Sequence, residues 1–465
     1  MEEIKDLGRR LRDFFREFRW CLRTETRDTS EYGLAYVSGL LRMQTDRTMS
    51  EIGRQTGTSE QNMQHFMSNS PWRGEAVIEE VQSQVRYHPE FQAGAMLIFD
   101  ESADAKAGET AAGSGRQHNG RLGKVEMSQV GVFASLVTPR VNTWIDGELY
   151  LPQSWFAPEA AQRREKAGIP GERYFQTKPE LVWTLVQRIH ATGVPFVAVA
   201  MDDLYGRNHL LRSRLDQADI EYYGDVPANT TVYLDKPQVH YIKTKRSKDV
   251  KRTVLAAHRC RVCDLFTSGA MERATITLRP SERGMLTADF ARCRVWTLVD
   301  DKPRQEWLLV RRSGRHITYA LSNACLETSL ETMAWRKSHR YFIERSNQDA
   351  KSELGWDEFQ AIKYRAWHHQ LALTILASWF IADTRLDWMA RMQRDPELLV
   401  QYETDVLPLL SVANVRELLR AAMPLPQLDT DQAIALVTKH LINRTRSRRS
   451  RLKRSRLSPN NARAP

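Results

Sequence analysis

The chain has 465 residues, more than a single domain usually holds, and its 42% hydrophobic content is enough to bury a large core. Lys and Arg outnumber Asp and Glu by 68 to 57, which gives a net charge of +11 and favours polyanionic partners such as nucleic acid. Every stretch of about twenty residues carries charges, and the N-terminus MEEIKDLGRR lacks the apolar run of a signal peptide, so a membrane protein is excluded and a soluble cytosolic protein is expected.

Residues 1–90 are predicted to form a helical DNA-binding domain. The run LGRRLRDFFREFRWCL places apolar residues at helical spacing with arginines between them. MSEIGRQTGTSEQNMQHFM then predicts a short helix, a turn at Gly57, a cap at Ser59 and a second helix. This pattern resembles a helix-turn-helix that directs residues 59–65 toward a DNA groove, but a helix pair that merely packs together fits it equally well.

Residues 91–224 are predicted to form the first part of an α/β core with a mixed sheet. Three strands are expected at 95–100, 127–137 and 141–151, followed by a capped helix at 177–193 and a buried strand at 194–202. In a sheet of the ribonuclease H-like kind, which has this order of strands and helix, the first and fourth strands lie side by side.

The rest of the chain is predicted in four parts. Residues 225–300, with basic runs such as YIKTKRSKDVKR, are expected to form a mostly β insertion, and residues 301–385 to return to the core with its last strands and helices. Within them HHQLALTILASWFIAD reads as a buried helix. A C-terminal helical region, 386–442, precedes a basic tail, 443–465, that is expected to be disordered and to add salt-dependent DNA affinity.

Five cysteines do not make a disulfide framework in a chain of this length, which fits a reducing compartment. Cys260 and Cys263 form a CxxC with His258 beside them, and Cys293 lies further on. A zinc site would need a clearer fourth ligand, so ordinary packing is the favoured interpretation of these side chains over metal binding.

Carboxylates follow two of the predicted buried strands. Asp100 and Asp202 each stand at a C-terminal strand end, where open α/β sheets place their ligands. Two such acids repel one another unless a cation lies between them, and oxygen ligands suit Mg²⁺ or Mn²⁺, with two ions expected per site. Glu344 is available as a third acid from a C-terminal helix. Arg340 and Lys351 lie four residues before it and seven after it, so all three are expected on one helix face, with the two cations reaching DNA phosphates.

At this point the sequence resembles a family, the insertion-sequence transposases with a DDE catalytic triad, in particular those with a β-strand insertion before the last acid. The matching residues are Asp100 in LIFDES, Asp202 in AMDDLYG, and Glu344 with Arg340 and Lys351 in R-x3-E-x6-K. SPWRGEAVI, GRLGKVEMSQVGV and EWLLVRR also resemble this family, and the likeness extends over about residues 30–385.

The resemblance implies a ribonuclease H-like fold and an enzyme that nicks DNA at transposon ends with a divalent metal and transfers strands through the freed 3′ hydroxyl. Asp100, Asp202 and Glu344 are then the catalytic metal ligands, and Arg340 and Lys351 bind phosphate. The partners implied are terminal inverted repeats, target DNA and a second subunit assembled on DNA, in the nucleoid of a bacterial cytoplasm.

The chain departs from the family pattern at one position. The fuller signature has a Tyr seven residues before the Glu, where this chain has Lys337, and Tyr341 is close but off register. The departure bears on how the flanking phosphate is held and on whether excision uses a hairpin intermediate. A Trp of the insertion stacks on a flipped base in that family; Trp296 and Trp307 are candidates, although a core position is the commoner fate of a Trp.

Nearby acids compete for the same roles. Asp203 is a candidate helix cap. Glu101 and Asp104 either support Asp100 or are surface charges. Glu353 lies two residues beyond Lys351 and so does not match the spacing that favours Glu344. Three functions follow in order of preference: a transposase, a catalytically inactive DNA-binding regulator that keeps the fold, and a metal-dependent nuclease without strand transfer.

Overall fold

The computed structural model describes residues 6–106, 108–119, 123–243, 250–255, 258–267, 271–281 and 284–425, with isolated positions between 431 and 452. The chain divides into two units, Met1–Met423 and Pro424–Pro465, and the elements below belong to the first. The basic tail predicted at 443–465 lies almost wholly outside the described residues.

Helices occupy most of residues 7–92, where the sequence predicts them. They are α2 (Leu7–Arg16), the 3₁₀ turn η1 (Arg19–Leu22), α3 (Ser30–Arg42), α4 (Met49–Gln55), α5 (Glu60–Ser68), α6 (Gly74–Tyr87) and α7 (Pro89–Gln92). Thr48 caps α4 by accepting a hydrogen bond from the Glu51 backbone N–H. Gly57, at φ +73°, turns the chain between α4 and α5, a conformation that favours glycine. Ser59 occupies the cap position of α5, but its side chain makes no capping hydrogen bond.

The central sheet has the strand adjacency that the sequence predicts. Its strands are β1 (Met96–Ala105), β2 (Gly115–Asn119), β3 (Lys124–Val137), β4 (Asn142–Leu149), β5 (Ala198–Met201) and β6 (Tyr222–Val226). β3 lies antiparallel between β1 and β4, while β5 lies parallel between β1 and β6, so the order is β4-β3-β1-β5-β6. Strand β2, which the sequence analysis did not predict, pairs with the start of β3.

One strand boundary was predicted wrongly. β1 does not end at Asp100 but continues to Ala105, because it keeps pairing with β3 over these residues. Its pairing with β5 does stop at Phe99 opposite Met201. Asp100 is therefore the first residue of β1 beyond β5, and Asp202 directly follows β5, so both acids lie at the same end of this strand pair.

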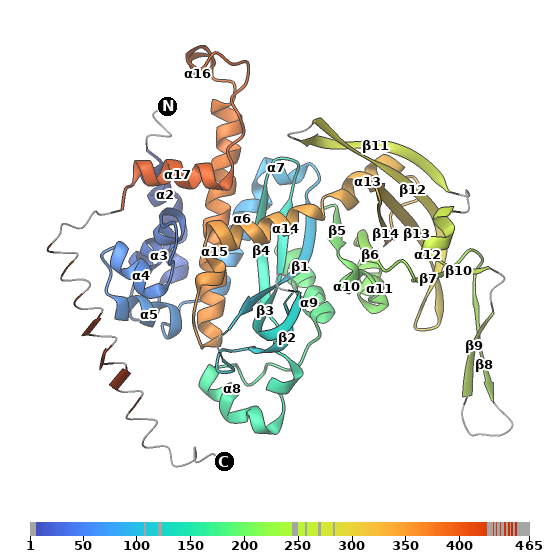
Figure 1. Ribbon diagram of the computed structural model, residues 1–465, viewed down its shortest axis with the longest axis horizontal. Coiled ribbons are helices and arrows are strands. Elements are labelled where there is room, and N and C mark those ends of the chain that lie inside the picture. Colours follow the sequence, from blue (N-terminus) through green and yellow to red (C-terminus); the bar gives the residue numbers. More distant parts are fainter. Residues whose placement is uncertain are drawn as a thin grey trace. The chain divides into compact units, whose positions relative to one another are not determined.

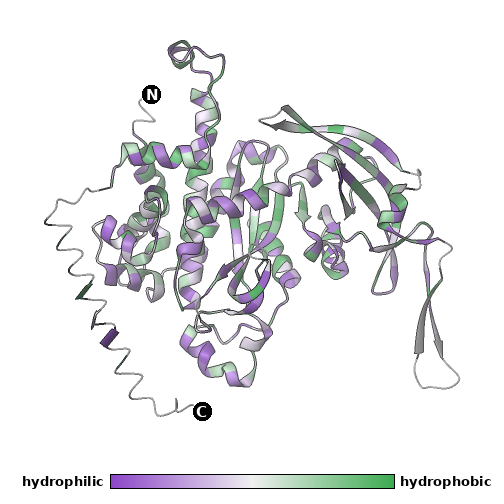
Figure 2. Ribbon diagram, viewed as in Figure 1, coloured by the Kyte–Doolittle hydropathy of each residue, from purple (hydrophilic) through white to green (hydrophobic). Residues whose placement is uncertain are grey.

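Helices flank the sheet. They include α8 (Ala161–Ala167), α9 (Lys178–Ala191), α10 (Asp203–Gly206), α11 (His209–Gln217) and α15 (Tyr364–Asp387). Figure 1 shows α15 standing between the sheet and the N-terminal helices, and it contacts β4, α6 and α3. In Figure 2 α8 is largely hydrophilic, whereas hydrophobic residues follow the central strands. Among the described residues, no helix has the length and apolar character needed to cross a bilayer.

The predicted β insertion is built onto the core sheet. Its elements include β7 (Thr231–Tyr233), β10 (Arg259–Arg261), α12 (Val262–Thr267), β11 (Glu272–Ser281) and β12 (Gly284–Val299), while β13 (Lys302–Ser313) and β14 (His316–Ser322) lie in the segment 301–385 that is predicted to return to the core. β14 pairs with β6, β13 with β14, and β12 with β13, so the ladder continues without interruption from the core into the insertion. Strands β8 (Gln238–Lys243) and β9 (Val250–Leu255) form a separate hairpin (Figure 1).

The helices predicted toward the end of residues 301–385 are separated by turns. It consists of α13 (Leu330–Ser338), α14 (Tyr341–Gln348), the π-helical turn η4 (Asp349–Glu353), the 3₁₀ turn η5 (Trp356–Glu358) and α15. Gly355, at φ +67°, allows the sharp change of direction before η5. The π-helical turn η6 (Trp388–Met392) and the helices α16 (Pro396–Gln401) and α17 (Val412–Ala422) follow in the described residues up to 425.

Candidate active site

Three carboxylates meet where β1 passes the end of β5. Oxygens of Asp100, Glu101 and Asp202 lie within 4.8 Å of one another. Asp202 is held by the start of α10, because its Oδ1 accepts hydrogen bonds from the backbone N–H groups of Leu204 (2.9 Å) and Tyr205 (3.2 Å). The donor set is oxygen only and carries three carboxylates, which fits a hard divalent cation such as Mg²⁺ or Mn²⁺.

Close packing places α10 against β6 and fixes the turn that carries Asp202. A Cβ added at Gly206 would lie 2.1 Å from the Asp225 backbone oxygen, and one at Gly224 would lie 2.7 Å from the Gly206 Cα. Both positions therefore require glycine for the helix to approach the strand. The approach brings Asp202 and Asp225, the one partly exposed residue of β6, to the same cavity.

The electrostatics of the cluster favour a bound cation. Burial, then the neighbouring charges of Asp202 and Glu101, raise the pKa of Asp100 to about 7. Burial, then Glu101, raise the pKa of Asp202 to about 6. Glu101 is held on its other side by Lys178 Nζ (3.0 Å) and by the buried Tyr205 hydroxyl (2.7 Å), which fixes its carboxylate beside the two aspartates.

Glu344 lies on the wall of the same cavity. A pocket of about 440 Å³ is lined by Asp100, Asp202, Asp225, Arg340 and Glu344, among others. The carboxylate of Glu344 is exposed and pairs with Arg340 Nη2 at 3.4 Å, and it is outside the tight group of three acids. The structure thus groups Asp100 and Asp202 closely and places Glu344 on the same cavity, outside that close group.

Arg340 and Lys337 bind the same carboxylate. Arg340 Nε lies 3.1 Å from Asp225 Oδ2, and the buried Lys337 Nζ lies 2.6 Å from Asp225 Oδ1. Burial alone would lower the pKa of Arg340, but the carboxylates of Asp225 and Glu344 raise it overall. Lys337, which stands where the family signature has Tyr, is therefore part of the wall behind Arg340, while Tyr341 is exposed.

The expected common face of Arg340, Glu344 and Lys351 holds only for the first two. Lys351 lies in the π-helical turn η4, whose wider coil changes the angular position of the side chains that follow Glu344. Its Nζ lies 3.1 Å from Asp104 Oδ1 and donates to the Ala103 backbone oxygen at 2.9 Å, so it is tied to the far end of β1.

The two tryptophans suggested for base stacking have different surroundings. Trp307 is buried in the core, its Nε1 donates to the Ala324 backbone oxygen at 3.1 Å, and Arg292 and Arg294 lie over its ring. Trp307 therefore occupies the core position weighed in the sequence analysis. Trp296 is partly buried, with Lys236 Nζ 5.7 Å from its ring centroid.

The CxxC segment shows ordinary contacts. His258 pairs with Asp235 at 3.0 Å, and Cys260 Sγ faces the Val232 backbone oxygen at 3.8 Å. Within the described part of the chain, the acidic cluster at Asp100 is the one group of three or more potential ligands close enough to share an ion.

Sequence reasoning missed several residues of this site. Asn347 on α14 donates to Asp100 Oδ2 at 3.3 Å and accepts from Trp144 Nε1 at 3.0 Å, which links the helix of Glu344 to the strand of Asp100. Asp225 could have been found by the rule that selected Asp202, since it also lies near the end of a buried strand. Lys178 and Asn347 gave no such signal, because each reaches the site from a helix whose orientation the sequence does not reveal.

The chain is similar to known proteins in sequence. A family model described as DDE superfamily endonuclease matches residues 13–260. The probable transposase for insertion sequence element IS701 of Microchaete diplosiphon is 24% identical over 332 residues, which cover 68% of this chain and 73% of that protein. The crystal structure of the NurA nuclease from Sulfolobus solfataricus is 10% identical and covers 59% of this chain and 85% of that chain, with a TM-score of 0.27 that carries no argument about the fold.

Proposed function

The chain belongs to the DDE superfamily endonucleases, and from this membership we propose that it is a DNA transposase that binds the terminal inverted repeats of an insertion sequence, cleaves them and joins them to target DNA. The observation that carries the proposal is the single cavity lined by Asp100, Asp202 and Glu344 together with Arg340. The strand order β4-β3-β1-β5-β6 supports a ribonuclease H-like core beneath this cavity.

The acids and the arginine that carry the proposal have separate roles. Asp100 and Asp202 hold the metal with Glu101 beside them, and Glu344 closes the site from α14. Divalent ions bound there would supply activation of the attacking oxygen and stabilisation of the leaving oxygen. Arg340, already oriented by Asp225, positions a DNA phosphate. Lys351 was expected to share that role, but its pairing with Asp104 assigns it to holding η4 against β1.

The chemistry proceeds in two steps of the same kind. Water first attacks a phosphodiester at the end of the element, breaks the P–O3′ bond and leaves a 3′ hydroxyl and a 5′ phosphate. That 3′ hydroxyl then attacks a phosphodiester of the target, which forms a new P–O3′ bond and releases a target 3′ hydroxyl. Because two ends must be joined to one target, we expect two subunits to assemble on DNA.

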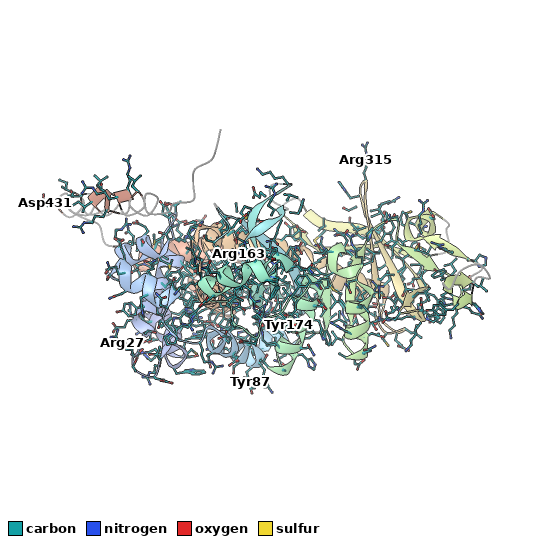
Figure 3. All side chains as sticks on the ribbon, turned by 90° about the horizontal axis from the view of Figure 1, so that it is seen from below. Arg27, Tyr87, Arg163, Tyr174, Arg315 and Asp431 are labelled. Atoms are coloured by element: carbon teal, nitrogen blue, oxygen red, sulfur yellow. The ribbon has the colours of Figure 1, made fainter. Side chains whose placement is uncertain are left out.

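The helix pair α4–α5 is the proposed reader of the terminal repeat. Its second helix exposes Asn62 and His65 beside a groove of about 980 Å³. Arg23, Arg27 and Arg73 line the same groove and are exposed; Arg27 is labelled in Figure 3 at the edge of the N-terminal helices. Amides and imidazoles bond base edges and arginines bind phosphates, so the groove has the side chains that duplex DNA requires.

Cleavage assays with three acid variants test the catalytic assignment. Asp100→Ala, Asp202→Ala and Glu344→Ala should each abolish Mg²⁺-dependent nicking of a duplex that carries the terminal repeat, while gel-shift affinity for that duplex stays near the wild-type value. Asp203→Asn is the matched control, because this exposed acid lines the cavity but pairs with Arg207. A fully active Asp202→Ala protein would refute the assignment.

A joining assay separates the transposase from the alternatives. A precut end with a free 3′ hydroxyl should be joined to a target plasmid by the wild-type protein. Nicking without joining would identify a nuclease, and end binding without nicking would identify a regulator that has lost the chemistry.

A further inference from the structure

Two acids of the segment that follows the helix of Glu344 each meet a buried arginine from outside the catalytic core. Glu353 lies at the end of η4 and pairs with Arg416 of α17. Glu358 lies at the end of η5 and pairs with Arg47, which stands in the joint between α3 and α4. These two pairs are called the arginine clamp below.

Arg47 contacts the segment 355–358 at several points. Its side chain is 1% exposed, and its Nη1 lies 2.7 Å from Glu358 Oε1, while its own backbone N–H donates to the same carboxylate. Its Nε donates to the Met43 backbone oxygen at 3.1 Å. A Cβ added at Gly355 would lie 2.6 Å from the Arg47 Cδ, so the turn before η5 packs directly on the arginine stem.

Arg416 makes a parallel set of contacts. Its Nη1 lies 2.5 Å from Glu353 Oε2, and its Nε donates to the Leu41 backbone oxygen at 3.1 Å. Its Nη2 donates to the Met43 backbone oxygen, the acceptor that Arg47 also uses. The two arginines therefore share an acceptor at the C-terminal end of α3, and each also binds one acid of the segment after α14.

These contacts leave the clamped segment little freedom to move. An arginine this deeply buried becomes an uncompensated charge when its acid is removed or displaced, which strongly disfavours separation of the pair. The helix α14 runs into η4 without a break, so holding Glu353 and Glu358 also holds the end of the helix that carries Glu344 and Asn347. On the other side, Arg47 is followed at once by Thr48, the cap of α4.

We infer that the arginine clamp couples the N-terminal helices to the position of Glu344, which makes Arg47, Arg416, Glu353 and Glu358 positioning residues for cleavage. The inference rests on the proposed catalytic role of Glu344. Movement of the α3–α4 joint when DNA occupies the helix pair is transmitted through the clamp to α14, because Arg47 and Arg416 both donate to Met43 in that joint and each binds an acid of the segment that follows α14.

The test uses Glu353→Gln and Glu358→Gln, alone and combined, in the full chain. Both acids are about one-quarter exposed, so the glutamine variants keep the shape and part of the hydrogen bonding. Single-turnover cleavage of a terminal-repeat duplex at saturating protein should slow about 10- to 100-fold in the double variant, whereas its Kd for that duplex changes by less than about twofold. Hydrogen exchange over residues 341–358 should become faster in the same variant.

The control is Asp289→Asn, which removes one exposed acid of the Arg312 pair on β12 and β13. The inference is overturned if the double variant is folded and cleaves at the rate of this control. If Glu358→Gln does not fold, Glu353→Gln decides the question with the same two measurements. Failure of the proposed function is a separate result, because it would show as an active Glu344→Ala protein.

Discussion

Nζ of Lys351 lies 3.1 Å from Oδ1 of Asp104, whose side chain is buried, while the side chain of Lys351 is 13% exposed. The pair joins η4, the π-helical turn after Glu344, to the last residues of β1. Asp100, which lines the cavity, lies earlier on the same strand. This ion pair explains why Lys351, which the sequence spacing predicts to bind phosphate, points toward β1.

Removal of the lysine should destabilise the fold. Lys351→Met leaves Asp104 buried without its nearest cation, so the free energy of unfolding should fall by about 3 kcal/mol. The Lys351→Met/Asp104→Asn double variant should recover part of that loss, because the buried charge of Asp104 is then also removed, although Lys106 loses the carboxylate that it faces. Urea denaturation measures both. Lys124→Met is the control, since this exposed lysine pairs loosely with Glu126 at 3.6 Å and should lose less than about 1 kcal/mol.

Asn347 should matter for rate more than for binding. Asn347→Ala removes the donor to Asp100 Oδ2 and the acceptor of the Trp144 indole, so the carboxylate is no longer oriented from α14. Single-turnover cleavage should slow about tenfold with the Kd for terminal-repeat DNA unchanged. The exposed neighbour Gln348 supplies the control as Gln348→Ala. Equal rates for the two variants would show that the Asn347 contact is incidental.

Glu101 should contribute to metal affinity. Addition of Mn²⁺ should raise the Tm of the wild-type protein, because a ligand that binds only the folded state stabilises it. Glu101→Gln removes one of the three carboxylates within 4.8 Å and should reduce this rise, whereas Asp203→Asn should leave it intact. If Mn²⁺ raised the Tm of Glu101→Gln as much as that of wild type, Glu101 would not be a metal ligand and would serve only to bind Lys178 and Tyr205.

Asp349 gives a prediction about pH. Burial raises its pKa to about 6 although Arg345 Nε lies 3.1 Å away. In the unfolded chain the same group ionises near pH 4, so the folded state holds the extra proton between about pH 4 and 6, and stability is lost as the pH rises through that window. Asp349→Asn should therefore be more stable than wild type by about 1 to 2 kcal/mol at pH 7 and equal to it below about pH 4.

Thermal unfolding at several pH values measures this difference. Glu31→Gln is the control for loss of a surface carboxylate, because Glu31 is exposed on α3. A constant difference between Asp349→Asn and wild type from pH 4 to pH 7 would show that the effect does not come from ionisation.

The sequence carried enough information to locate the centre of the site. Asp100 and Asp202 could be paired because buried strands of a recognisable order place their ends together, and strand adjacency depends on topology rather than on fine geometry. The residue beside them, Glu101, could not be assigned in advance. Successive side chains of a strand point to opposite faces, so Glu101 is expected on the face opposite Asp100. Its carboxylate joins the cluster because β5 ends beside it and because Lys178 and Tyr205 bind it there.

Spacing along a helix was a less reliable guide. Arg340 and Glu344 are neighbours as expected, but the shift at Lys351 comes from a π-helical turn, and a single-sequence pattern of period 3.6 contains no signal for such a turn. The arginine clamp could not be predicted either, because it depends on long-range contacts. Arg47 and Arg416 lie more than 300 residues apart in the chain, and each looks like any solvated arginine until the fold buries it.

The pairings of β6 with β14, of β14 with β13 and of β13 with β12 make the catalytic half and the insertion share one backbone ladder. An excised version of the core would expose the edge of β6 as unpaired amides and carbonyls, a surface on which other chains aggregate. Protein engineers who want a minimal catalytic fragment should therefore retain β12, β13 and β14, or cover that edge with a designed strand.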